Sequence, residues 1–528
     1  MHLRRIQTEI VKGALPWAAL AALLCVGADG QVRQAPREAG IRPTTVCSSL
    51  AELTSHDSSI LSAEHIAGPE GHADRCRVVG VLPPEIVFEV VLPSSWNGRI
   101  LMSGNGGYAG TSPDAPNRRR RSDQVASRGF VSVYTNTGHD RRAEPLGTFA
   151  LNNRQKEIDY SFRAVRLTIQ TAKELTELFY GQAANYTYWE GCSTGGRQGL
   201  MAAQRFPTDF DGIVVGAPVL NFTDTQIWGA WNARALAEAP ISLSEIGVVA
   251  DAVYDRCDAL DGLRDGLIVD PRNCGFDPAK HLPPCDDAAG SECLSAEQID
   301  ALKKIYGGVI SRGERLFPGQ PLGAEAGPPS GSRRSSGWDR WIISERGPSR
   351  QAVFAETFMR YMAFEPDEPD FDLRSFDFDA DPHRMDFMRS ILDATDPDLT
   401  RFRDAGGKMI MYFGWADTAL NPLMGVNYYE DVQAVTGPRT KDFFRLFMVP
   451  GMFHCGGGLG VSRADYLGAL MAWVEVGTAP DRLVAERVVE GATELTRPLC
   501  PYPEVATYDG EGDPKSADSF ACGPPRKR

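Results

Sequence analysis

Short apolar runs alternate with amphipathic stretches through the first part of the chain. Five runs rich in β-branched and aromatic residues, each bounded by turn residues, predict strands. They are EIVFEVVLP (85–93), RILMSG (99–104), GFVSVYTN (129–136), NYTYWE (185–190) and DGIVVGAPV (211–219). The turn SSWNG between the first two runs predicts a hairpin. Apolar residues recur at helical spacing from Lys156 to Tyr180, which predicts a long helix, and RQGLMAAQRF predicts another directly after NYTYWE.

The regular alternation stops at about Asn221 and returns after Asp396. The segment between them is rich in Pro, Gly, Asp and Ser, with helical pieces such as SAEQIDALKKIYGG (295–308). Strand patterns then reappear in KMIMYFGWAD (408–417) and RLFMVPGMFHC (445–455), and ADYLGALMAWVEVG (464–477) predicts a late amphipathic helix. A core interrupted in this way predicts an α/β fold, with a catalytic domain (29–220 and 397–528) and an inserted lid domain (221–396).

Charge and the first residues narrow the class of protein. The formal net charge is −14 and no basic stripe is present, so we expect no nucleic-acid partner. Residues 1–28 place basic residues before an apolar stretch, Ala14 to Val26, and small residues after it, as a signal peptide does. Because no later stretch is both long and uncharged, we also expect no membrane partner and a secreted or periplasmic protein.

Cysteine usage agrees with export. Of the 11 cysteines, Cys25 would leave with the signal peptide, and the remaining ten suit five disulfides in an oxidising compartment. Counting alone leaves their pairing open. The ten are Cys47, Cys76, Cys192, Cys257, Cys274, Cys285, Cys293, Cys455, Cys500 and Cys522.

The segment Gly191-Cys192-Ser193-Thr194-Gly195 matches the G-x-S-x-G nucleophile elbow and lies between a predicted strand and a predicted helix. A plain glycine-rich turn is the alternative. A serine nucleophile needs a base, and an α/β-hydrolase places it late in the chain. His454, after the strand RLFMVP, is the histidine in that position, and Asp417 in GWAD is the preferred acid over Asp396 and Asp398.

Backbone N–H groups must hold the negative charge that develops on the carbonyl oxygen. Thr194, directly after the serine, supplies the first, and the loop SGNGGYAG (103–110) offers Gly106 or Gly107 for the second, with a plain turn as the alternative. If Ser193 and His454 meet, the adjacent Cys192 and Cys455 come within disulfide distance. A free, nucleophilic Cys192 fits an oxidising compartment poorly.

The Cys-Ser pair in the elbow, the later Asp417 and the His454-Cys455 pair resemble the tannase and feruloyl esterase family, which also includes a terephthalate-monoester hydrolase. The resemblance covers nearly the whole chain after the signal peptide. It implies an α/β-hydrolase fold with a lid, a Cys192–Cys455 disulfide beside the triad, and four further pairs. These are Cys47–Cys76, Cys257–Cys274, Cys285–Cys293 and Cys500–Cys522.

The segment CDALDGLRDGLIVDPRNC (257–274) places four aspartates between two cysteines. Clustered carboxylates repel one another unless a cation lies among them, and Ca²⁺ accepts carboxylate and carbonyl oxygens. A solvated acidic loop is the alternative. The family resemblance implies a structural Ca²⁺ held by the side chains of Asp258, Asp261 and Asp265 and the carbonyls of Leu263 and Leu267.

Together these features predict an exported serine hydrolase in which Ser193, His454 and Asp417 form a triad. The resemblance implies a small aromatic ester substrate, free or attached to a plant polysaccharide or polyphenol. Aromatic residues of the insertion are candidates for the acyl pocket: Trp338, Trp341, Phe354, Phe358, Tyr361 and Phe364. The alternatives are a peptidase on the same scaffold and a catalytically silent binding protein.

Overall fold

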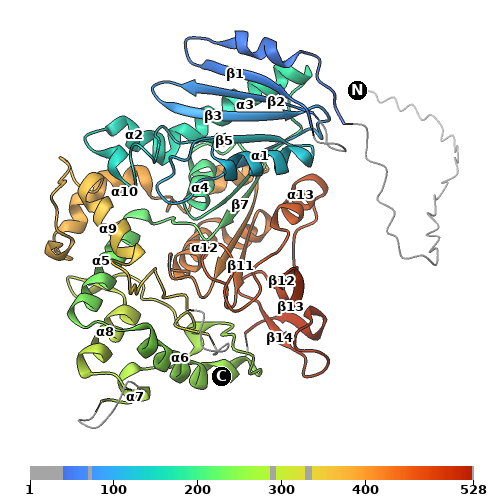
Figure 1. Ribbon diagram of the computed structural model, residues 1–528. Coiled ribbons are helices and arrows are strands. Elements are labelled where there is room, and N and C mark those ends of the chain that lie inside the picture. Colours follow the sequence, from blue (N-terminus) through green and yellow to red (C-terminus); the bar gives the residue numbers. More distant parts are fainter. Residues whose placement is uncertain (1–39, 69–73, 286–292, 328–335, 526–528) are drawn as a thin grey trace, which may run out of the picture. The chain divides into compact units, whose positions relative to one another are not determined.

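A nine-stranded sheet runs through the described part of the chain (Figure 1). The structure is a computed structural model that describes residues 40–68, 74–285, 293–327 and 336–525. The predicted signal peptide lies outside these residues. In sheet order, the strands are β1 (Ser59–Ile66), β2 (Arg75–Leu82), β3 (Ile86–Pro93), β5 (Val131–Thr135), β4 (Arg99–Ser103), β6 (Tyr186–Cys192), β7 (Gly212–Gly216), β10 (Lys408–Gly414) and β11 (Phe444–Val449).

The sheet has an antiparallel part and a parallel part. Strands β1, β2, β3 and β5 pair antiparallel, whereas the neighbours from β5 through β4, β6, β7 and β10 to β11 are parallel. Every residue of β5 and of β7 is buried, because helices cover both faces of the parallel part. The carboxyl ends of parallel strands form one edge, where α/β proteins place their active sites.

The predicted hairpin between residues 85–93 and 99–104 is wrong. Strand β5 lies between β3 and β4, pairing antiparallel with the first and parallel with the second. The connecting turn therefore carries the chain past one strand position instead of reversing it. Trp96 in this turn is fully buried and stacks on Tyr180, so the turn is held by packing and not by a hairpin ladder.

Alternate residues of the central strands enter different apolar clusters, as the period of two in a strand requires. Ile100 and Met102 of β4 join one large cluster, and Leu101 between them joins another. The first cluster is covered by α3 (Ala164–Tyr180), α4 (Thr194–Arg205) and α12 (Leu423–Thr436), and the second by α1 (Pro116–Ser127) and α13 (Tyr466–Val476).

The segment predicted as a long helix from Lys156 to Tyr180 is interrupted. It consists of α2 (Arg154–Ile158), one π-helical turn (Asp159–Arg163) and α3. A π turn holds an extra residue per turn and is often found beside functional sites. The apolar spacing alone did not show this change of period.

Residues between β7 and β10 form the insertion, and Figure 1 shows its helices to one side of the sheet. Its main helices are α5 (Phe222–Glu238), α6 (Leu243–Cys257), α8 (Ala296–Gly307), α9 (Arg350–Tyr361) and α10 (Asp386–Leu392). A separate apolar cluster lies among α5, α6 and α8. Residues 40–528 nevertheless form one compact unit, and the lid boundaries stay a prediction.

Five disulfides join described cysteines, and they are the five pairs that the family resemblance implied. A search of the described residues for a helix long and apolar enough to span a membrane finds none. Two small hairpins, β12 (Leu483–Val489) with β13 (Ala492–Leu499) and β14 (Val505–Tyr508) with β15 (Phe520–Gly523), complete the C-terminal part.

Candidate active site

Ser193 lies in a sharp turn between the end of β6 and the first residue of α4. Its φ of 64° and ψ of −123° are unusual for a residue with a side chain, and such strain is typical of a nucleophile elbow. The glycines on either side are needed for close packing. A Cβ on Gly191 would lie 2.6 Å from the carbonyl carbon of Gly195, and a Cβ on Gly195 would lie 3.0 Å from the carbonyl oxygen of Asn105.

Asp417 and His454 form a hydrogen-bonded pair. The fully buried Asp417 follows β10, and its Oδ1 accepts the backbone N–H groups of Ala419 and Leu420 at 2.9 and 3.0 Å. The other carboxylate oxygen lies 2.8 Å from Nδ1 of His454. This contact places the proton of a neutral imidazole on Nδ1 and leaves Nε2 free to accept another.

The rival acids do not contact the histidine. Asp396 and Asp398 are both exposed. The Asp396 carboxylate accepts the backbone N–H of Asp398 at 2.9 Å, and the Asp398 carboxylate accepts that of Thr400 at 3.0 Å. These turns occupy their carboxylates away from the imidazole. Of the three candidate acids, only Asp417 meets His454.

The Cys192–Cys455 disulfide joins the elbow to the loop that carries His454, with 6.0 Å between the Cα atoms. Its two cysteines directly adjoin Ser193 and His454 in sequence. In the described chain no hydrogen bond joins the Ser193 hydroxyl to the imidazole, but both side chains line the same cavity. The bridge limits how far the two loops move apart, and catalysis is sensitive to displacements of about 1 Å.

The cavity around Ser193 has a volume of about 570 Å³ and a mainly apolar lining. A cavity of this size accepts a ligand of drug-like dimensions, such as a substituted aromatic ester. Its lining combines the elbow and base loop with residues of the insertion. The insertion contributes Phe222, Thr225, Gln226, Trp341, Arg350, Gln351, Val353 and Phe354.

Three backbone N–H groups at the cavity have no acceptor among the described residues. They belong to Gly106, Gly107 and Thr194, and all three residues line the cavity. Thr194 is the first residue of α4, so its N–H has no partner within the helix and lies at the positive end of the helix dipole. This arrangement suits an oxyanion that forms beside Ser193.

Sequence and structure comparisons point to one family. The family described as tannase and feruloyl esterase matches residues 71–523. Mono(2-hydroxyethyl) terephthalate hydrolase of Piscinibacter sakaiensis is 36% identical, over 89% of this chain and 87% of that protein. Feruloyl esterase B of Aspergillus niger is 30% identical, over 86% and 88%. The crystal structure of feruloyl esterase B from Aspergillus oryzae gives a TM-score of 0.78 at 26% identity, covering 90% of this chain and 99% of that one.

The chain belongs to the tannase and feruloyl esterase family. Its fold is that of an α/β-hydrolase, as the solved relatives show, and it is a carboxylic ester hydrolase. The fold class and the family resemblance found in the sequence are thereby confirmed.

In this tannase and feruloyl esterase family member, two of the six predicted lid aromatics line the cavity, Trp341 and Phe354. The rings of Trp341 and His454 lie nearly perpendicular to each other, with 5.6 Å between their centroids. Of the remaining four, Tyr361 is half-buried away from the cavity lining. The other three are buried in the core of the protein: Trp338, Phe358 and Phe364.

Arg350 and Gln226 are among the polar residues of the cavity that sequence reasoning missed. The Arg350 guanidinium lies over the Trp341 ring, 5.1 Å from its centroid, and has no acidic partner among the described residues. The buried amide of Gln226 likewise has no hydrogen-bond partner there. The sequence did offer one indication of Arg350. It lies one helical turn before the predicted pocket residue Phe354 on α9, so the two side chains share a helix face.

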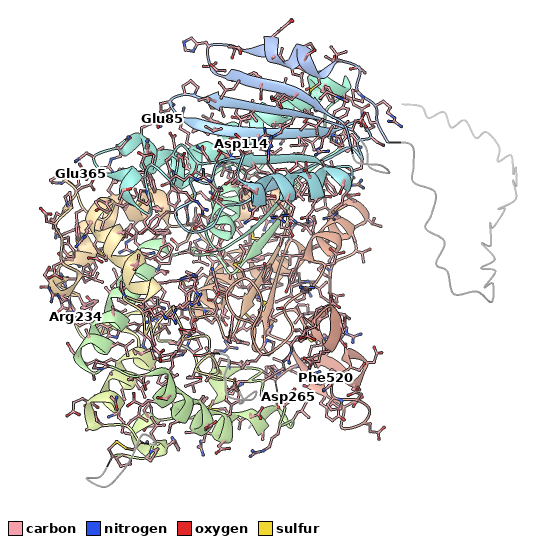
Figure 2. The ribbon with its side chains drawn as sticks, in the orientation of Figure 1. Glu85, Asp114, Arg234, Asp265, Glu365 and Phe520 are labelled. Carbon is pink, nitrogen blue, oxygen red and sulfur yellow. A yellow bond between two sulfur atoms is a disulfide. The ribbon has the colours of Figure 1, made fainter. Side chains whose placement is uncertain are left out.

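The predicted calcium loop lies outside the cavity lining. Asp258 accepts the N–H of Gly266 at 3.1 Å, and Asp265 pairs with Arg497 at 2.7 Å. The Arg497 guanidinium also lies over the Phe520 ring, 4.1 Å from its centroid. Asp265 and Phe520, the two residues that Arg497 contacts, are labelled in Figure 2.

Burial raises the pKa of Asp258, and the nearby Asp265 raises it further. The pKa of Asp261 rises to about 6 for the same two kinds of reason, burial first and then its acidic neighbours. The loop offers carboxylate and carbonyl oxygens, which are the ligands that Ca²⁺ accepts. In the described conformation, however, no three acidic, histidine or cysteine side chains are close enough to hold a metal. The oxygen ligands therefore suit Ca²⁺ chemically, but in the described conformation their side chains are not gathered around one position.

Proposed function

We propose that this carboxylic ester hydrolase acts through a Ser193–His454–Asp417 triad on esters of aromatic acids. One observation carries the proposal: a strained elbow serine and an imidazole hydrogen-bonded to a fully buried carboxylate line the same cavity. The buried Asp417 accepts two backbone N–H groups as well, which hold its carboxylate in the orientation that meets His454.

In the proposed reaction, the Ser193 oxygen attacks the ester carbonyl and His454 takes the hydroxyl proton. The carbonyl oxygen becomes an oxyanion, held by the N–H of Thr194 and by that of Gly106 or Gly107. The C–O bond to the alcohol then breaks, and His454 returns the proton to the leaving alkoxide. Water repeats the cycle on the acyl-enzyme, releasing the acid and the free serine.

The cavity lining supports an aromatic acyl group that carries a negative charge. Trp341 and Phe354 offer aromatic rings, and Arg350 offers a guanidinium that has no acidic partner among the described residues. Arginine binds carboxylates through paired N–H donors, so a monoester of an aromatic dicarboxylic acid would fit both features. The relative from Piscinibacter sakaiensis is named for such a terephthalate monoester, and this chain is 36% identical to it.

Two further properties belong to the same proposal. The basic and apolar pattern of residues 1–28 and the five disulfides support export to a secreted or periplasmic location. The acidic loop from Asp258 to Asp265 supports a structural Ca²⁺ in the insertion, completed by the carbonyls of Leu263 and Leu267. No step of the reaction uses that ion.

The test is ester turnover by purified wild type and Ser193→Ala. Wild type should hydrolyse aryl esters in a panel of feruloyl, galloyl and terephthaloyl compounds. The variant should lose activity by about 10⁴-fold or more, with an unchanged circular dichroism spectrum, because the acyl-enzyme no longer forms. Full activity of Ser193→Ala would contradict the triad. Faster cleavage of matched peptide amides than of esters would instead favour the peptidase alternative.

A further inference from the structure

We propose that the hydroxyl groups of Tyr160 and Thr194 position the oxyanion loop by holding the carbonyl group of Gly107. The inference rests on the proposed function and assigns a role to a residue outside the triad. Tyr160 is a positioning residue, because it acts on the reacting atoms only through the backbone of Gly107.

Two hydrogen bonds converge on a single carbonyl oxygen. The Gly107 carbonyl accepts the Thr194 hydroxyl at 2.6 Å and the Tyr160 hydroxyl at 3.0 Å. A carbonyl oxygen has two lone pairs, so these donors use its full accepting capacity. The peptide plane that follows Gly107 is therefore fixed from two directions.

The peptide plane before Gly107 is fixed as well. Its carbonyl, that of Gly106, accepts the backbone N–H of Ala109 at 3.0 Å. In a trans peptide the N–H of Gly107 points opposite to this carbonyl. With both planes held and a φ of 55°, which favours glycine, Gly107 presents an N–H that has no acceptor among the described residues.

The π-helical turn explains how Tyr160 reaches the loop. Tyr160 is the second residue of the turn Asp159–Arg163, between α2 and α3, where the extra residue changes the direction of the side chains. Its backbone carbonyl accepts the guanidinium of Arg197 at 3.2 Å, and Arg197 is one turn after Ser193 on α4. The elbow helix, the π turn and the oxyanion loop are thus connected through one tyrosine.

Tyr160 is fully buried, and burial raises the pKa of its phenol above the usual value. The hydroxyl therefore keeps its proton and remains a hydrogen-bond donor at neutral pH. A Gly107 carbonyl that lost this donor would keep only the Thr194 hydroxyl, and the loop would gain freedom to turn its N–H away from the oxyanion.

The experiment compares Tyr160→Phe with wild type and with a matched control, Tyr180→Phe. Tyr180 is also buried and also donates its hydroxyl to a backbone carbonyl, at 2.7 Å, but its acceptor is Pro93 and not a residue of the oxyanion loop. Both variants remove one hydroxyl and keep the ring. Tyr160→Phe should lower kcat about tenfold, part of the 10²–10³-fold that loss of an oxyanion donor costs, with KM unchanged. Tyr180→Phe should leave kcat unchanged.

A second readout separates positioning from general loss of structure. An arylboronic acid forms a tetrahedral adduct with Ser193 and places an oxygen where the oxyanion forms, whereas an ether analogue of the substrate has no carbonyl. Tyr160→Phe should weaken the boronic acid about tenfold and leave the affinity of the ether within twofold. Adding Thr194→Val, which removes the second hydroxyl, should weaken the boronic acid further.

Three outcomes contradict the inference: an unchanged kcat in Tyr160→Phe, an equal loss in Tyr180→Phe, or an equal weakening of the boronic acid and the ether. In each of these cases an active wild type would leave the proposed function standing. If wild type neither turns over esters nor binds the boronic acid, the proposed function fails and the inference fails with it.

Discussion

The two walls of the cavity are built in different ways. On the catalytic wall, the elbow, the oxyanion loop and the base loop are held by backbone contacts, by the Cys192–Cys455 bridge and by glycines in close contact. On the lid wall, Trp341, Arg350 and Phe354 present side chains from α9 and the loop before it, and all three are partly or largely exposed. In the proposed function, the first wall carries the chemistry and the second wall carries substrate recognition.

Tyr108 and Phe354 connect the two walls through a hydrogen bond and a ring stack. The Tyr108 hydroxyl donates to the backbone carbonyl of Phe354 at 2.9 Å, and the two rings stack at 5.1 Å. Tyr108 follows Gly107 directly in the oxyanion loop. The lid wall is thereby anchored to the catalytic wall through its backbone, while its cavity-facing side chains remain free to differ. A fold of this kind keeps its reaction and changes its substrate by exchanging lid side chains.

The largest effect in this comparison is expected on the catalytic wall, from Asp417→Asn. An asparagine keeps the shape but loses the charge that supports an imidazolium, and its amide favours the wrong tautomer of His454. We expect kcat to fall about 10³–10⁴-fold, measured on the best aryl ester.

Asp396→Asn is the matched control, because Asp396 precedes the same strand and the hydrogen bond that its carboxylate makes among the described residues is a local turn contact. It should stay within twofold of wild type. A loss in Asp396→Asn that equals the loss in Asp417→Asn would remove Asp417 from the triad.

On the lid wall, Arg350→Gln should change substrate choice more than it changes chemistry. For a monoester with a free carboxylate, kcat/KM should fall about 10–100-fold, since hydrogen bonds between charged groups contribute about 1.5–3 kcal/mol. The neutral dimethyl ester of the same acid should change less than threefold. Steady-state kinetics on this pair of substrates measures the difference directly.

Arg350→Lys keeps the charge without the paired donors and should fall between wild type and Arg350→Gln. If both esters lost activity equally, Arg350 would support the cavity wall and would not recognise a carboxylate. Arg350 would then have to be removed from the residues of the lid wall that recognise the substrate.

The sequence predicted the catalytic wall better than the lid wall. The elbow, its acid and its base follow strand ends, and the order of strands along the chain restricts where such residues occur. Arg350 and Gln226 follow no such rule, because a cavity residue on a helix of the insertion looks like any other polar helical residue. The same limit explains the hairpin error, since strands adjacent in sequence need not be neighbours in a sheet.

The π turn that carries Tyr160 was equally hidden. Apolar residues on both sides of it keep a nearly helical spacing, and one extra residue changes the period too little to be seen in sequence. The five disulfide pairs came from the family resemblance and not from counting, which left their pairing open.

The smallest effect should come from the acidic loop, which contributes to neither wall. If Ca²⁺ binds there, adding it at about 100 times its Kd to chelator-treated protein should stabilise the fold by roughly 2–3 kcal/mol. The thermal midpoint should rise by a few degrees, about 2–5 °C for a chain of this size, while kcat stays unchanged. Differential scanning calorimetry with and without the ion measures the shift.

Asp261→Asn should abolish that shift, because it removes one implied ligand, whereas Asp270→Asn should keep it. Asp270 is in the same loop but pairs with Arg272 at 2.7 Å and is not among the implied ligands. A wild type indifferent to Ca²⁺ would leave the loop as a solvated acidic segment held by Arg497. A calcium effect on kcat instead of on the thermal midpoint would show that the loop influences the cavity, and the acidic loop could then no longer be treated as separate from the two walls.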